Sequence, residues 1–323
     1  MSRRSDYAAA LEVSVLALQQ WSVGRAPPTR LDGRQPVSPG SVSPERPVPD
    51  SVPAPPWYHG RMPSGMAREE VHDEEGMARM RVAGALAARC LALAGAMVAP
   101  GVTTDELDAG VHACVVDAGG YPSPLRSKGF PKSVCASVNK VVCHGIPDDR
   151  PLQDGDIVNV HVTVFLGGVH ADTSATFAVG TVSEAAAQLL AAAREALSAG
   201  IAAVVPAARY ADIGAAIAAV ARAHGLGVVT RFVGHGIGSA FHSTPHIHHH
   251  EQGWMERVLL GSNRRIRPST SFTIEPLLVD RGGLMSSVVG GDEWTVRTAD
   301  LGLTAQFEHT VLVGRDGRAE VVT

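Results

Sequence analysis

The sequence has neither a large net charge nor a long uninterrupted apolar run. Its 323 residues carry a formal net charge of −4, which offers little attraction to a nucleic acid or an acidic membrane surface. The longest apolar helical pattern, near residues 81–99, includes Arg89 and has a polar side. A membrane span needs about 18 consecutive apolar residues. The sequence therefore predicts neither a nucleic-acid nor a membrane partner.

Hydrophobic residues make up 45% of the chain, which is ample for a large core. Cysteine, in contrast, is scarce. The first residues, MSRR, precede a short apolar stretch that Glu12 interrupts, which is not typical of a signal peptide. We therefore expect a cytoplasmic protein with reduced thiols. The four cysteines, none in a C-x-x-C pair, are Cys90, Cys114, Cys135 and Cys143.

Proline is concentrated near the N-terminus, where residues 27–56 contain ten prolines. Each proline removes a backbone donor and clashes with the preceding helical turn, so this stretch should be extended or polyproline II. Such a segment is either a docking site for another protein or a strap or linker, and we favour the strap or linker. We divide the chain into an N-terminal extension, residues 1–67, with a small helix expected over 8–21, and a globular domain, residues 68–323. P-x-x-P spacing occurs at Pro36/Pro39, Pro44/Pro47 and Pro53/Pro56.

The globular domain contains an internal repeat. The segment APGVTTDELDAGVHACVVDAGGY aligns with VPAARYADIGAAIAAVARAHGLG. Each copy has an acid followed by an aliphatic residue at the same offset, Glu106 or Asp212. Each helix ends at a glycine, Gly119 or Gly225, as a C-terminal stop signal requires. A second alanine-rich helix precedes each copy, over about 77–98 and 183–203.

Strand-like runs follow each predicted helix pair. Two copies of helix, helix and strands predict a pseudo-symmetric α+β domain. Its natural binding site is the interface between the two copies. The expected strands cover residues 133–143, 157–165 and 170–179 in the first copy, and 228–233, 271–279 and 303–314 in the second.

Residues 159–174, NVHVTVFLGGVHADTS, predict a hairpin with valines on one face and polar residues, His161 among them, on the other. If the turn centres between Leu166 and Gly167, His161 lies opposite Asp172, and Asn159 lies opposite Ser174. Opposed Cβ atoms are about 4.5–5.5 Å apart. This distance suits either a shared metal ion or a plain hydrogen bond between His161 and Asp172.

Two further carboxylates favour the metal. Glu275 in SFTIEPLLV and Glu308 in TAQFEHTVLV are lone acids in apolar runs that contain no lysine or arginine. A buried carboxylate is costly unless it is paired or bound to a cation. Histidines stand beside glycines in VVCHGIP, at His144, and in GHGIGSAFH, at His235 and His242. Three carboxylates with several histidines suit a divalent transition metal.

The stretch KSVCASVNKVVCHGIPDDRPLQDGDIVNVHVTVFLGGVHADTSATFAVG closely resembles the type I methionine aminopeptidases, which have the pita-bread fold. The likeness continues through GHGIGSAFH, FTIEP, DEWTVRT and TAQFEHT, from about residue 70 to the end. It implies a pseudo-two-fold α+β domain with an antiparallel sheet covered by two helix pairs. It also implies a hydrolase that removes N-terminal methionine from peptides or nascent proteins. The cofactor would be one or two divalent ions of Fe, Co, Mn, Ni or Zn.

The resemblance implies a role for each candidate residue. Asp172 and Glu308 would bridge two metal ions, while His235 and Glu275 would complete the first site. Glu275 would also be the general base. The scissile amide nitrogen would be contacted by His144, and the substrate carbonyl by His242. The pocket for the first side chain would be lined by Phe130, Cys135, Phe241 and Trp294, with Ser127 at its rim.

The fifth metal position departs from the family, which has an aspartate where this chain has His161. A neutral imidazole gives one nitrogen and no charge, whereas aspartate gives two oxygens and a negative charge. This leaves open a one-metal enzyme, a two-metal enzyme with another metal preference, or a changed reaction. Ser127 and Lys140 also replace a tyrosine and a glutamate of the family. The histidine tract that follows His242 has no counterpart in the family. We expect it to be a solvated loop outside the active site, and its residues are His246, His248, His249 and His250.

Two rival functions stay open at this point. One is a paralogue recruited to a different metal-dependent reaction in specialised metabolism. The other is a catalytically weak binding protein whose proline-rich arm does the binding. The replacement of the family's aspartate by His161 supports both rivals. The presence of His144, His242 and Glu275, which match the family, is evidence against the second.

Overall fold

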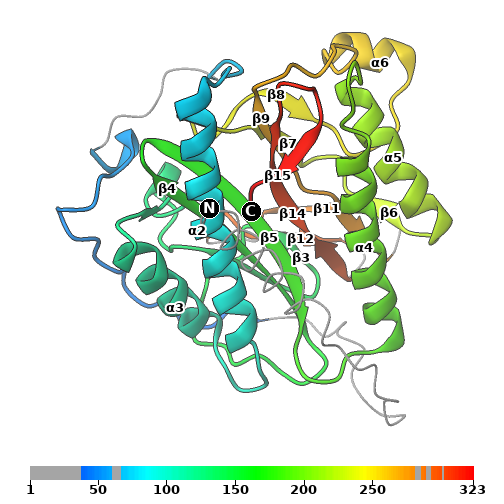
Figure 1. Cartoon of the computed structure of the whole chain (residues 1–323). Helices are drawn as coiled ribbons and strands as arrows, with labels where there is room; N and C mark the ends of the chain where they lie inside the picture. Colours follow the sequence, from blue (N-terminus) through cyan, green and yellow to red (C-terminus); the bar gives the residue numbers. More distant parts are fainter. Residues whose placement is uncertain (1–37, 60–66, 281–284, 289–291, 300–301) are drawn as a thin grey trace, which may run out of the picture.

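The computed structural model describes residues 38–59, 67–280, 285–288, 292–299 and 302–323, so the helix expected over 8–21 lies outside the described residues. Four long helices lie on one side of a twisted antiparallel sheet (Figure 1). They form two pairs that match the two repeats of the sequence. The pairs are α2 (Glu74–Met97) with α3 (Thr104–Asp117), and α4 (Glu184–Ala202) with α5 (Tyr210–Ala223).

The acid shared by the two repeats caps the N-terminus of a helix in each copy. Glu106 is the third residue of α3, and its carboxylate accepts a hydrogen bond from the backbone N of Thr103 at 2.7 Å. Asp212 of α5 accepts in the same way from the backbone N of Arg209 at 2.7 Å. These bonds satisfy donors that the first helical turn leaves unpaired. After each helix the chain turns away at a glycine in the left-handed region, with φ of 75° at the first and 67° at the second.

The main sheet has the strand order β1-β4-β5-β14-β9-β7-β8, with β2 beside β4 and β15 beside β14, and all its pairings are antiparallel. The β5–β14 pairing joins the strands of the first repeat to those of the second. The expected pseudo-two-fold fold is therefore confirmed. The strands are β1 (Tyr121–Pro122), β2 (Cys135–Val138), β4 (Ile157–Leu166), β5 (Val169–Ala178), β7 (Gly234–Gly236), β8 (Ser243–Ile247), β9 (Ser271–Ile274), β14 (Glu308–Val313) and β15 (Ala319–Val321).

Three of the expected strands are interrupted. The run expected over 133–143 breaks between β2 and β3 (Val141–Cys143) at Asn139, which has a left-handed φ of 56°. The run over 271–279 breaks after β9 because Pro276 has no N–H to donate. The run over 303–314 divides into β13 and β14. Two small sheets result, one of β13 (Thr304–Gln306), β10 (Leu277–Val279) and β6 (Gly227–Val228), the other of β11 (Met285–Val288), β12 (Val296–Thr298) and β3.

The β4–β5 hairpin has a different register from the predicted one. Leu166 pairs with Val169, so the turn is Gly167-Gly168, with φ of 60° and 82°. Two positive φ values match the two-residue turn that fits the twist of a hairpin. His161 therefore lies opposite Ser174, and the expected opposition of His161 and Asp172 is wrong by two residues, as is that of Asn159. A shift of two keeps both side chains on the same face.

The valine face of β4 is buried under α2. Met80, Ala87 and Cys90 of this helix are fully buried in one cluster with Val160 and Val162. By length and composition α2 is apolar enough to cross a membrane, but a buried core helix has the same composition. The polar face of β4, with His161, therefore points away from the helices.

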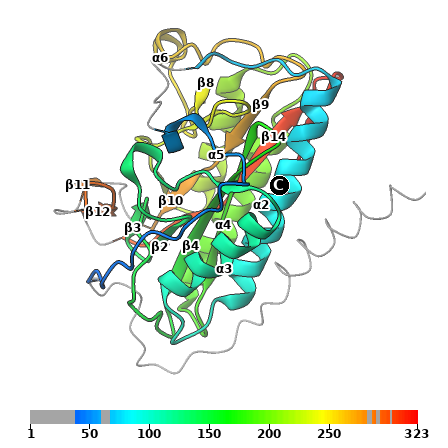
Figure 2. The ribbon, with the colours of Figure 1, turned by 90° about the vertical axis from the view of Figure 1, so that its left-hand side faces the viewer.

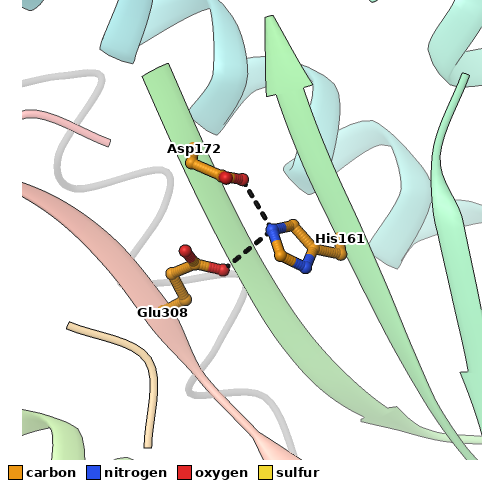
Figure 3. Close-up of side chains that lie close together, drawn as sticks. All are labelled: His161, Asp172 and Glu308. Atoms are coloured by element: carbon orange, nitrogen blue, oxygen red, sulfur yellow. Dashed lines mark hydrogen bonds and ion pairs between the residues drawn. The ribbon is translucent and has the colours of Figure 1, made fainter. Parts of the chain in front are cut away.

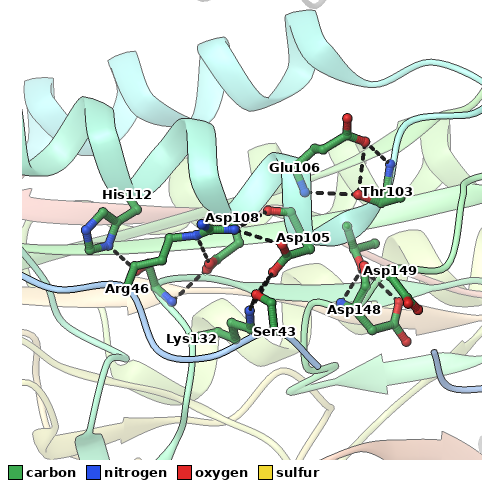
Figure 4. Close-up of polar contacts among 12 residues, drawn as sticks. Ser43, Arg46, Thr103, Asp105, Glu106, Asp108, His112, Lys132, Asp148 and Asp149 are labelled. Atoms are coloured by element: carbon green, nitrogen blue, oxygen red, sulfur yellow. Dashed lines mark hydrogen bonds and ion pairs between the residues drawn. The ribbon is translucent and has the colours of Figure 1, made fainter. Parts of the chain in front are cut away.

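Residues 38–59 form an extended strap along the domain, drawn in blue in Figure 2. Its polar contacts are made with α3 and nearby loops (Figure 4). Arg46 donates to Asp105 Oδ2 at 2.8 Å and to Asp108 Oδ2 at 3.1 Å. The backbone N of Gly40 donates to Asp148 Oδ2 at 2.7 Å. The described part of the proline-rich segment is thus held by acids of the globular domain.

The end of the strap reaches the rings beside the predicted site. It closes with η1 (Pro56–His59), whose Trp57 stacks on His170 with ring centroids 5.2 Å apart and lies 5.9 Å from Phe241. Trp57 is 8% exposed. The extension therefore contributes a buried aromatic residue next to Phe241, one of the residues expected in the substrate pocket.

Candidate metal centre

The five predicted metal ligands come from five neighbouring strands. The sheet order β4-β5-β14-β9-β7 places them side by side, although they span nearly 150 residues of sequence. Both repeats contribute, as expected for a site at their interface. In sheet order the residues are His161 on β4, Asp172 on β5, Glu308 at the start of β14, Glu275 directly after β9, and His235 on β7.

Three of these side chains meet directly (Figure 3). His161 Nε2 lies 2.6 Å from Asp172 Oδ1 and 3.0 Å from Glu308 Oε2. One ligand atom from each of the three falls within 4.8 Å of the others, as a shared metal ion requires. Thr163 Oγ1 also donates to Asp172 Oδ1 at 2.8 Å and so orients that carboxylate.

His235 and Glu275 form the other side of the centre. His235 Nδ1 donates to the carbonyl of Gly236 at 3.1 Å, which leaves the lone pair of Nε2 free to bind a metal. This Nε2 is 3.8 Å from Glu275 Oε1. A Cβ at Gly234 would collide with the carbonyl of Thr273, and one at Gly236 with a carbonyl of β8. The glycines beside His235 therefore allow close strand packing.

The carboxyl groups of the centre are buried, which makes their negative charge costly. Asp172 is 1% exposed and Glu308 is fully buried. Burial raises the pKa of Glu308 well above its usual value and that of Glu275 to about 7. Burial lowers the pKa of His161, but the neighbouring Asp172 and Glu308 outweigh it and raise the pKa to about 10. His161 and Asp172 are thus in close polar contact, with Glu275 and Glu308 beside them.

Glu308 shows that this donor set suits a cation. Among the described residues, neither of its carboxylate oxygens has a hydrogen-bond partner, although both are buried. Its Oε2 lies 3.0 Å from Nε2 of His161. A buried carboxylate without donors is costly unless a cation compensates it. The residues present therefore fit a divalent metal ion.

Comparisons with known proteins place this site in a family. The model of metallopeptidase family M24 matches residues 78–315. The chain belongs to this family. It is 47% identical over 295 residues to methionine aminopeptidase 1D, chloroplastic/mitochondrial, of Arabidopsis thaliana, covering 91% of this chain and 81% of the relative. It is 45% identical to methionine aminopeptidase 2 of Mycobacterium tuberculosis, covering 91% and 99%.

Solved structures agree. The crystal structure of a methionine aminopeptidase from Rickettsia prowazekii superposes with a TM-score of 0.74 at 40% identity, covering 79% of this chain and 99% of the other. A methionine aminopeptidase from Thermotoga maritima also has a TM-score of 0.74, at 28% identity. The family hydrolyses peptides with one or two divalent metal ions. The resemblance, the metallopeptidase class and the cofactor inferred from the sequence are confirmed.

In this M24 member, the residues expected to contact substrate form two groups of rings, one of which lies beside His235. The ring of His242 lies 4.2 Å from that of His235 and 4.1 Å from that of Phe241, centroid to centroid. The ring of Trp294 is 6.2 Å from that of His144 and 5.1 Å from that of Phe130.

The remaining pocket candidates are placed by the backbone. Cys135 of β2 pairs with His161 in the sheet register. Ser127 begins η2 (Ser127–Gly129) and accepts a hydrogen bond at its carbonyl from the backbone N of Phe130 at 3.0 Å. His144 has a left-handed φ of 57° and is followed by a glycine in close contact with β2, and burial lowers its pKa to about 4.

The M24 centre also uses residues that the sequence reasoning missed. Thr273 Oγ1 donates to Glu275 Oε1 at 2.7 Å, and Gln306 Nε2 donates to Glu275 Oε2 at 3.2 Å. Thr310 Oγ1 donates to the carbonyl of Asp172 at 2.8 Å. Each of these residues lies two positions from a proposed ligand in the sequence. Side chains two positions apart on a strand share one face of the sheet, so this spacing was the signal that could have found them.

The expectation of a solvated histidine tract is wrong at His249. This residue is 2% exposed, and its Nε2 accepts a hydrogen bond from the backbone N of Glu275 at 3.3 Å. Burial alternates along Ser243, Pro245 and Ile247 and continues to His249, so the buried side of β8 runs past its last residue. His250 is half-buried, and its Nε2 contacts Glu256 Oε1 at 2.7 Å.

Proposed function

We propose that the protein removes N-terminal methionine from peptides or nascent proteins in a metal-dependent hydrolysis. The observation that carries this proposal is the set of five ligand-type side chains on five neighbouring strands. The identities of 47% and 45% to proteins named methionine aminopeptidases support the same activity. They favour it over a changed metal-dependent reaction and over a binding protein without activity.

We propose that Asp172, His235, Glu275 and Glu308 hold the main metal ion. Their chemistry, three carboxylates and one imidazole, suits Fe, Co, Mn, Ni or Zn. When bound, the ion makes water a nucleophile at neutral pH. Glu275 would take the proton from the attacking water, since its carboxylate lies at the edge of the centre, 3.8 Å from His235.

The neighbouring histidines would hold the peptide. His242, exposed beside His235, would donate to the substrate carbonyl, and His144, on the side of Trp294, would contact the scissile amide nitrogen. Phe130, Phe241 and Trp294 would surround the methionine side chain. The remaining pocket residues would be Cys135, opposite His161, and Ser127 at the rim.

We infer that His161 limits the centre to a single metal ion. Its Nε2 lies between Asp172 and Glu308, which would both have to face a second ion. The ring therefore occupies the space that this ion would need. An aspartate there would add a chelating, negatively charged ligand, whereas imidazole offers one nitrogen.

The experiment is to load the purified chain separately with Fe²⁺, Co²⁺, Mn²⁺, Ni²⁺ and Zn²⁺ and to measure methionine released from a Met-Ala peptide. We expect release with at least one metal, about one metal ion bound per chain, and no release after chelation. Stoichiometric metal without release under any of the five metals would overturn the peptidase proposal. Two ions per chain at micromolar metal would overturn the single-ion inference alone.

The nascent-chain N-terminus is the partner we propose, in the cytoplasm. All four cysteines are free thiols, which suits a reducing compartment. The relatives include organellar and bacterial proteins. The strap over residues 38–59 is occupied with its own domain, which gives no support to docking through the proline-rich segment.

A further inference from the structure

The chain leaves the β-ladder at Glu275. Ile274 ends β9 and pairs with His309 of β14, while β10 begins only at Leu277. The backbone N–H of Glu275 therefore has no strand partner, yet the residue is only 8% exposed. A buried N–H without a partner is costly, so another acceptor must satisfy it.

His249 supplies this acceptor. Its Nε2 lies 3.3 Å from the backbone N of Glu275, and the ring is 2% exposed. A ring nitrogen accepts only when it is unprotonated. The backbone N–H that faces Nε2 can only donate, so this ring nitrogen is the acceptor.

The main chain around His249 is itself fixed. A Cβ at Gly214 of α5 would collide with the carbonyls of His248 and His250, so the tract is packed directly against that helix. On the other side, His250 contacts Glu256 of α6 (Trp254–Leu259) at 2.7 Å. His249 therefore presents its ring to Glu275 from a rigid support.

The other atoms of Glu275 are held from elsewhere. Thr273 and Gln306 donate to its two carboxylate oxygens at 2.7 Å and 3.2 Å. Gln306 Nε2 also lies 3.4 Å from its carbonyl oxygen. The backbone N is the remaining polar atom, and His249 is the residue that holds it. The direction of the carboxylate depends on all these contacts together.

We propose that His249 is a positioning residue that fixes the backbone of Glu275 and so aims its carboxylate at the metal centre. This inference rests on the proposed function, in which Glu275 is a ligand and the general base. His249 acts through Glu275, because its ring is buried and its Nε2 faces the backbone N of that residue. A buried histidine with a purely structural role would affect folding and leave metal binding unchanged.

A matched pair of variants tests this role. In His249→Gln the side-chain carbonyl can reach the place of Nε2 and accept the bond. His249→Met has a similar length and no comparable acceptor. The control His250→Met lies on the same tract but contacts Glu256. Titration calorimetry of metal-free protein with Mn²⁺ gives the dissociation constant, and Met-Ala hydrolysis at saturating metal gives kcat and KM.

We expect His249→Met to weaken metal binding ~10–100-fold, as the loss of outer-shell partners does, and to lower kcat with KM nearly unchanged. His249→Gln should recover most of both, and His250→Met should stay within about twofold of the original protein. Unchanged metal affinity and kcat in folded His249→Met would overturn the inference. If His249→Met does not fold, a folded His249→Gln with strongly weakened metal binding would overturn it instead.

One further variant separates this inference from the proposed function. Glu275→Gln should lose metal affinity whether or not His249 matters. If Glu275→Gln binds Mn²⁺ like the original protein, the ligand assignment fails. If Glu275→Gln loses Mn²⁺ while His249→Met keeps it, the positioning role alone fails.

Discussion

Replacing His161 with aspartate changes the space and the charge at the centre of the site. His161 Nε2 lies 2.6 Å from Asp172 Oδ1 and 3.0 Å from Glu308 Oε2. The shorter aspartate clears this position and adds a negative charge. We expect the number of bound metal ions to rise from one to two per chain. Methionine release should rise with it if the second ion assists hydrolysis as an additional positive charge.

The size of the effect follows from the added charge. A unit negative charge and a divalent ion about 4 Å apart interact by roughly 8 kcal/mol at the effective dielectric constant of a protein site. If desolvation of the new carboxylate and of the ion offsets three quarters of this energy, about 2 kcal/mol remains, which is ~30-fold in the dissociation constant of the second ion. Titration of metal-free protein with Co²⁺ or Mn²⁺ measures this constant.

The matched control is His161→Asn, which clears the same space without adding a charge. It should bind a second ion much more weakly than His161→Asp. One ion per chain in His161→Asp, with unchanged affinity, would refute the reasoning about space and charge. An equal gain in both variants would show that space alone decides. Two ions without any gain in peptidase activity would point to selection of His161 for another reaction.

Three further predictions concern the ligands, the pocket and the strap. Glu308→Gln should abolish tight metal binding, because Glu308 is a central carboxylate of the site, and full metal content in that variant would contradict its assignment. Methionyl peptides with a small second residue should be cleaved much faster than leucyl or arginyl peptides, because Phe241 and Trp294 suit an unbranched apolar side chain, and equal rates in a competition assay would disprove methionine specificity. Arg46→Met should lower the free energy of unfolding by about 2 kcal/mol, because it leaves the buried carboxylate of Asp108 with one cation fewer; the exposed Arg222→Met should cost less than about 0.5 kcal/mol, and equal melting temperatures for the two variants would show that the strap contact is weak.

The repeat made the helices readable from the sequence. Its shared acid, at Glu106 and Asp212, turned out to be the capping residue of each helix, and its glycines lie where the helices end. Such signals are local, so they survive in a linear pattern. The hairpin register was less accessible, because two adjacent glycines allow more than one turn position. Only the pairing of Leu166 with Val169 selects among these positions.

Lone acids in apolar strands indicated a cation at Asp172, Glu275 and Glu308, and the assignment of the metal ligands stays a prediction. The supporting residues could not be predicted, because their role depends on which strands become neighbours. His249 shows this most clearly. Its burial comes from α5 and β9, which are distant in sequence, and a run of histidines looks hydrophilic until the alternation from Pro245 and Ile247 is followed further. The same is true of the strap. The role of Arg46 can be recognised only once the fold places it beside the acids of α3.

The most direct measurement of the proposed activity is the release of free methionine from a Met-Ala peptide by the metal-loaded chain, followed by mass spectrometry. We predict that each cleaved peptide yields one free methionine, that this release requires bound metal, and that Glu308→Gln releases none. An intact peptide after incubation with chain that carries one metal ion per molecule, under each of the five metals, would contradict the assignment of this centre as a methionine aminopeptidase.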